Sequence, residues 1–163
     1  MSIHTAKRLS FKSLMLFPWL AICLCHANET VFVPKAQLVT DNVYAIIGPL
    51  GQRSLANAGL NANYGFVVTD KGVILIDSGA SAHSAALLEK AISQVTAKPV
   101  RWVLNTGSQD HRWLGNEYFA RKGAQIQALA ETVQTQKTHG EQQIAGLTRF
   151  VGDQMKGTQV QYA

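Results

Sequence analysis

Short runs of apolar and β-branched residues, separated by turn-forming residues, dominate the chain between residues 36 and 80. The pattern predicts strands at residues 37–39, 43–47, 64–69 and 73–77. The last two are joined by Asp70-Lys71-Gly72, in which glycine supplies the positive φ that a tight hairpin needs. This part of the chain is therefore predicted to be an antiparallel sheet.

The pattern then changes from β to alternating α and β. Residues 73–76 are apolar without alternation, which predicts a strand covered on both faces. A helix is predicted next, because its apolar positions recur at helical spacing, at Leu88, Ala91, Ile92 and Val95.

The remaining elements follow the same alternation. They are a strand at 100–104, a polar loop at 105–116, a short helix at 117–121, a strand at 125–128, and one long or broken helix from 130, with Gly140 as the possible break. Strands first and alternating units afterwards predict an α/β layered architecture.

The polar loop after the 100–104 strand carries the candidate chemistry. An amide, an acid and an imidazole follow one another there as Gln109, Asp110 and His111. Such loops commonly hold functional groups, because a rigid sheet positions them while they stay accessible. Residues 48–63 form another loop, which contains Arg53 and which we interpret as a connector, although it could lie over a site.

Residues 1–27 have the pattern of a secretory signal. Three basic residues precede an apolar run of about 12 residues, at 14–25, and cleavage is expected after Ala27. The run is too short to span a membrane, although an uncleaved N-terminal anchor remains the alternative. We therefore expect a periplasmic or secreted protein with one domain at 28–163 and no stable membrane insertion after cleavage.

Cleavage changes both the charge and the cysteine content. The signal holds three of the 15 basic residues and none of the 10 acidic ones, so the net charge falls from +5 to +2. No basic stripe with interleaved aromatic residues occurs, which argues against nucleic acid as a partner. Cys23 and Cys25 leave with the signal, so the remaining chain has no thiolate ligand and no disulfide.

Two motifs resemble the N-terminal half of the metallo-β-lactamase superfamily. Residues 73–79 end an apolar strand in Asp-Ser-Gly, and residues 105–116 contain Asn-Thr, Asp-His and Gly-Asn at the family's spacing. The resemblance covers about residues 37–130 and is closest to a secreted branch of the family. It implies an αβ/βα sandwich with zinc at the sheet edge, and metal-hydroxide hydrolysis of an ester, thioester, amide or lactam.

The chain departs from the family motif His-x-His-x-Asp-His at its first two histidines. Gly107 and Gln109 stand in those positions, so the first metal site is expected to be altered or lost. Gln109 offers only an amide oxygen, a weak zinc ligand. By resemblance, Asp110 and His111 are the remaining metal ligands, for one zinc ion at most, and Asp110 is the catalytic residue that orients a metal-bound water.

Each candidate also has a structural interpretation. Asp110 could accept hydrogen bonds from loop N–H groups while His111 packs beside Trp113. Asp77 could orient the metal ligand His111 by accepting a hydrogen bond from its ring, or only close its strand. His139 is expected to be a surface residue, because it lies in a polar helical stretch.

The family's remaining ligands lie well beyond the position of His111, so we expect only the N-terminal αβ half of the sandwich. Such a half would expose an apolar sheet face and favour self-association. Two functions stay open. One is an exported metallo-β-lactamase-fold hydrolase of a small-molecule substrate; the other is a non-catalytic binding or scaffold descendant, or an inactive truncated product.

Overall fold

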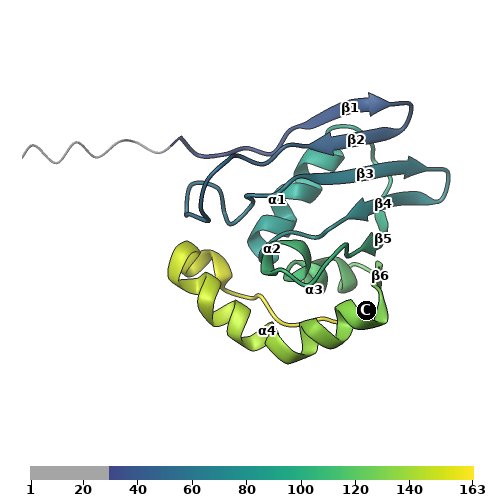
Figure 1. Cartoon of the computed structure of the whole chain (residues 1–163). Helices are drawn as coiled ribbons and strands as arrows, with labels where there is room; N and C mark the ends of the chain where they lie inside the picture. The colour runs from purple at the N-terminus through teal and green to yellow at the C-terminus, as the bar shows by residue number, and fades with distance from the viewer. Residues whose placement is uncertain (1–29) are drawn as a thin grey trace, which may run out of the picture.

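The computed structural model of the chain describes residues 30–163, so the expected signal and both cysteines lie outside the described residues. Figure 1 shows a single sheet with helices beside it. The elements are β1 (Ala36–Thr40), β2 (Val43–Ile46), β3 (Tyr64–Thr69), β4 (Gly72–Ile76), α1 (Ala82–Ser93), β5 (Val100–Leu104), α2 (Asp110–Trp113), α3 (Asn116–Ala120), β6 (Gln125–Gln127), α4 (Ala130–Val151) and the 3-10 helix η1 (Gly152–Met155).

The six strands lie in the order in which they occur in the sequence, β1-β2-β3-β4-β5-β6. The first four pair antiparallel, whereas β4, β5 and β6 pair parallel. The parallel pairs need crossovers, which α1 and the α2–α3 segment provide. The predicted α/β architecture is confirmed, and the carboxyl ends of β4 and β5 meet at one edge of the sheet.

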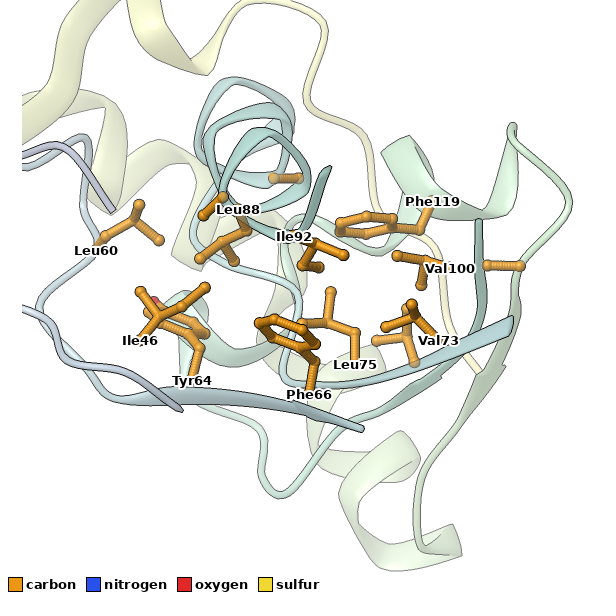
Figure 2. Close-up of a cluster of buried hydrophobic side chains, with 14 residues drawn as sticks. Ile46, Leu60, Tyr64, Phe66, Val73, Leu75, Leu88, Ile92, Val100 and Phe119 are labelled. Carbon is orange, nitrogen blue, oxygen red and sulfur yellow. The ribbon is translucent and has the colours of Figure 1, made fainter. Parts of the chain in front are cut away.

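The main core lies between one face of the sheet and helices α1 and α3. Figure 2 shows Phe66 and Leu75 of the sheet facing Leu88 and Ile92 of α1, with Phe119 of α3 beside them. All five are at most 2% exposed. Each such side chain stabilises the fold by about 2 kcal/mol through burial of apolar area.

The opposite face of the sheet is only partly shielded by the described residues. Ile74 and Ile76 of β4 point away from α1, pair with Trp102 and Leu104 of β5, and stay half-buried. Ile74, Trp102 and Leu104 line a shallow groove of about 510 Å³ together with Gln127 and the β3–β4 turn. The prediction that β4 is covered on both faces is therefore wrong for the described chain.

Helix α4 runs unbroken through Gly140, so of the two forms that the pattern allowed, long or broken, the structure has the long helix. A Cβ at Gly140 would lie 3.0 Å from both Trp113 Cη2 and Val160 Cγ1. The glycine lets α4 approach α2 and the C-terminal segment closely. A second cluster, which includes Trp113, Leu147 and Val151, fills that contact. No helix within residues 30–163 has the length and apolar character needed to cross a bilayer.

We expect the half-buried sheet face to drive self-association of the purified chain, because Trp102 and its neighbours form an apolar surface that water does not favour. Sedimentation velocity over a range of concentrations should show oligomers, and Trp102→Gln should shift the chain towards monomer. Leu38→Gln is the control, because Leu38 is 64% exposed but lies on the other face. A monomer at every concentration would contradict the expectation.

Candidate functional site

The candidate site lies where β4 and β5 end. Asp77 directly follows β4, and the loop of residues 105–109 follows β5 and leads into the single helical turn of α2. Asp110 and His111 open that turn, whereas the sequence pattern predicts a loop there. The backbone N–H of Arg112 bonds the carbonyl of Gln109 at 2.8 Å, which starts the turn.

Asp110 and His111 converge on Arg53, which comes from the loop between β2 and β3. Arg53 Nη2 donates to Asp110 Oδ1 and lies 2.8 Å from His111 Nδ1. The side chains of Arg53, Asp110 and His111 are 23%, 17% and 14% exposed, so the cluster is largely shielded from water. The loop of residues 48–63 is thus more than a connector, and Arg53 is the site residue that sequence reasoning placed outside the site.

Burial by itself would raise the pKa of Asp110. The hydrogen bonds from Arg53 and from the His111 backbone N–H, together with the Arg53 charge, outweigh burial and hold the pKa of this carboxyl below its usual range. The backbone N–H of His111 donates to Asp110 Oδ1 at 2.7 Å. Asp110 is therefore a stable carboxylate that accepts a loop N–H group, as its structural interpretation expects.

Asp77 is 3% exposed and has a positive φ of 62° at the end of β4. Its carboxylate accepts 2.7 Å hydrogen bonds from the backbone N–H and the hydroxyl of Thr106, and a 3.2 Å contact from Arg112 Nη1. Arg112 also donates to the Thr106 hydroxyl. In the described structure Asp77 binds Thr106 and Arg112, and it makes no hydrogen bond to His111 that would orient the ring.

Gln109 and Gly107 stand where the resemblance places the family's first two histidines. The side chain of Gln109 accepts a 2.7 Å hydrogen bond from Arg112 Nε, so its amide oxygen already has a partner. A Cβ at Gly107 would lie 3.1 Å from Arg112 Cδ. Arg112 therefore packs against Gly107 and binds Gln109. Its guanidinium also contacts Thr106 and Asp77.

Ser78, Asn105 and Asn116 form a buried polar network that contacts the backbone of this loop. Ser78 Oγ and Asn105 Nδ2 donate to Asn116 Oδ1 at 2.8 and 3.0 Å, and Asn116 Nδ2 donates to Asn105 Oδ1 at 2.8 Å. The carbonyl of Arg112 accepts from the Ser78 N–H at 2.9 Å and from Asn105 Nδ2 at 3.1 Å. Three residues of the family motifs thus fix the loop and stay at most 7% exposed.

The backbone of His111 is also held from the sheet. Tyr64 of β3 donates its hydroxyl to the His111 carbonyl at 3.1 Å. Burial, followed by the nearby Asp77 charge, raises the pKa of Tyr64, so the phenol stays neutral and remains a donor. Trp113 is fully buried and donates to Gln143 and to the Ser108 carbonyl. His139 is exposed on α4, as predicted.

The donor set does not fit a catalytic zinc ion. Within residues 30–163, no three His, Cys, Asp or Glu side chains are grouped so that they could hold one metal. Catalytic zinc usually has three protein ligands and an open position, whereas only Asp110 and His111 are present here. Both of these donors also bind a guanidinium, so the zinc expected from the resemblance has no complete site among the described residues.

Comparisons with known proteins place the chain's middle segment in one family model. Residues 58–141 match the model of the metallo-β-lactamase superfamily. A comparison with curated protein sequences finds no match. The family match includes both motifs and the whole polar loop at 105–116, and it confirms the resemblance that the motifs indicated.

Solved structures agree with this match at the level of the fold. The metallo-β-lactamase FIM-1 from Pseudomonas aeruginosa, in its mono-zinc form, is 18% identical with a TM-score of 0.55, and the match covers 68% of this chain and 48% of that one. A metallo-β-lactamase from Erythrobacter litoralis is 18% identical with a TM-score of 0.55, covering 66% and 46%. One from Pontibacter korlensis is 18% identical with a TM-score of 0.52, covering 66% and 47%. The chain thus spans about half the length of these structures, and its sheet and helices correspond to a partial αβ half of that fold.

Substituting Gly115 by alanine should destabilise the fold by about 3 kcal/mol or more, because a Cβ there would lie 2.1 Å from the carbonyl oxygen of Ser78. Chemical denaturation measures the loss. Gly146→Ala is the matched control, since nothing lies within 4 Å of its Cβ position. Within helix α4, that alanine should stabilise by about 1 kcal/mol. Equal effects at both glycines would contradict the packing of Gly115 against Ser78.

Replacing Asp110 by asparagine should remove a stabilisation that depends on pH. Because folding lowers the pKa of this carboxyl, the stabilisation is complete above the unfolded pKa and is lost as the pH falls through the folded pKa. The wild-type advantage should be on the order of 1–2 kcal/mol at pH 7 and should shrink below about pH 4. Urea titrations from pH 3 to pH 7 measure it. Asp153→Asn, at a carboxylate that is 87% exposed, is the control and should have little effect. A wild-type advantage that stays constant down to pH 3 would count against the Asp110 interactions.

Proposed function

Because this chain belongs to the metallo-β-lactamase superfamily, whose fold is that of metal-dependent hydrolases, we propose that it is an exported member without zinc-dependent hydrolysis. Its first metal site is lost, and it acts as a non-catalytic binding or scaffold protein. The expected signal at 1–27 supports a periplasmic or secreted location.

One observation carries this proposal: both remaining metal ligands of the motif are engaged by Arg53. At the first site, Gly107 has no donor and the Gln109 oxygen binds Arg112. A hydroxide nucleophile at neutral pH needs a metal that lowers the pKa of bound water to about 7. Asp110, already paired with a guanidinium, is a weak base and does not replace that metal.

The proposed scaffold role uses what the site retains, which is its rigidity. The network of Ser78, Asn105 and Asn116 needs no metal to hold the loop. A loop held in one conformation loses little entropy on binding a partner. The charge after signal cleavage and the lack of a basic aromatic stripe argue against nucleic acid as that partner.

The second candidate is a hydrolase of a small-molecule ester, thioester, amide or lactam. It is favoured by the placement of Asp110 and His111 at the carboxyl edge of a parallel pair, where α/β proteins commonly bind ligands. It requires ligands from a part of the fold that this chain does not span, and it requires Arg53 to leave the two donors.

Metal content and turnover together separate the two candidates. After refolding with excess zinc and desalting, the wild-type chain should carry well under one zinc per chain by elemental analysis. It should not hydrolyse a nitrophenyl ester, a thioester or a chromogenic β-lactam above background. One zinc per chain, with hydrolysis that Asp110→Asn abolishes, would establish the hydrolase instead. Asp153→Asn, at an exposed carboxylate, is the matched control for Asp110→Asn.

A further inference from the structure

We propose that Arg53 is an internal cation that occupies the metal position between Asp110 and His111 and excludes a divalent ion from it. The inference rests on the proposed function and deepens it, because it names the group that takes the metal's place. Family resemblance assigns the acid and the imidazole to a metal, whereas here the two donors converge on a guanidinium.

The convergence occurs at a single nitrogen. Arg53 Nη2 contacts Asp110 Oδ1 and lies 2.8 Å from His111 Nδ1, and those two acceptor atoms are 3.3 Å apart. A guanidinium only donates hydrogen bonds, so His111 Nδ1 must accept and its ring proton must lie on Nε2. The lone pairs of these two atoms are therefore directed at Arg53.

The chain holds Arg53 in place from both sides. Asn57, which is 7% exposed, donates from Nδ2 to the carbonyl of Gln52 at 2.8 Å. Its Oδ1 accepts from the backbone N–H of Ser54 at 2.9 Å and of Gly59 at 3.0 Å. The residues immediately before and after Arg53 are thus fixed by one buried amide. This arrangement differs from a surface ion pair between two freely moving side chains, which contributes little.

The guanidinium and a divalent ion cannot both bind there. A metal in contact with Asp110 Oδ1 and His111 Nδ1 would lie within about 3 Å of Arg53 Nη2, where like charges repel strongly in a partly shielded site. Binding a metal would therefore require Arg53 to leave and its carboxylate hydrogen bond to break. In return, the metal would gain only two protein ligands.

Substitution at position 53 tests the exclusion directly. Zinc affinity is measured by competition with a chromophoric chelator for the wild type, Arg53→Ala, Arg53→Lys and Arg53→His. Arg53→Ala should gain weak zinc binding, and Arg53→His should bind zinc about 100-fold more tightly than the wild type, because it adds a third ligand. Arg53→Lys keeps the cation and should bind no better than the wild type.

Two controls make the gain specific. Arg121→His places an imidazole beside Glu117 in another arginine–carboxylate pair, where no second ligand converges, and it should leave zinc affinity unchanged. Adding Asp110→Asn to Arg53→His should remove the gain. If both Arg53→Ala and Arg53→His fold, by their thermal transitions, but bind zinc no better than the wild type, the inference is overturned.

A measurement on the wild-type chain does not depend on a variant folding. The ¹⁵N resonances of the His111 ring should report an unprotonated Nδ1 and a protonated Nε2, and one equivalent of zinc should leave them in place. Zinc that shifts them would overturn the exclusion. If the resonances stay unchanged but the Arg53 variants gain no zinc affinity, only the inference is overturned. If the wild type binds zinc and hydrolyses a substrate, the proposed function is overturned as well.

Discussion

The side chain of Asn116 is the polar contact on which the carboxyl edge of the sheet depends. It is fully buried, its oxygen accepts from Ser78 and Asn105, and its nitrogen donates to Asn105 and to the carbonyl of Gln161. An amide has two donor hydrogens and two acceptor lone pairs, and here all four are used. One side chain therefore joins the ends of β4 and β5, the start of α3 and the C-terminal segment.

The position of the polar loop at 105–116 follows from this contact. Because α3 begins at Asn116, the preceding turn α2 has to fit between that anchor and the end of β5. The Arg112 carbonyl fixes the position of α2, because it accepts hydrogen bonds from the Ser78 N–H and from Asn105 Nδ2. Gly115 lets the turn approach Ser78, since any larger residue would meet the Ser78 carbonyl. Neutral hydrogen bonds and packing thus hold this part of the loop in the described structure.

Charge balance at the site then comes from arginine. The carboxylates of Asp77 and Asp110 are each paired with a guanidinium, from Arg112 and Arg53 respectively. A buried carboxylate without a partner costs several kcal/mol, and in the described structure a guanidinium is the partner of each. Arginine is suited to this task, because its charge is permanent and its planar group can reach two acceptors.

Much of the fold could be predicted from local pattern. The hairpin around Gly72, the periodicity of α1 and the strand before the polar loop all depend on residues close in sequence. The two motifs identified the family because they report the same local geometry. The helical turn of α2 was missed, since four residues give no periodicity to detect. The sequence left open whether the last helix breaks at Gly140, because the close contact with Trp113 that explains this glycine is visible only in three dimensions.

The site was only half predictable, for a related reason. Asp110, His111 and Gln109 are adjacent in sequence, whereas Arg53 is separated from Asp110 by 57 positions and lies in a loop with no periodic pattern. A sequence motif shows which donor residues are present, but it does not show which cation they bind. Motif residues with neutral side chains, such as Ser78, Asn105 and Asn116, serve the loop's shape, and they survive whether or not a metal is bound. A match to these motifs is therefore evidence for the fold first. The chemistry of this chain depends on whether Asp110 and His111 face a metal ion or, as in this structure, the guanidinium of Arg53.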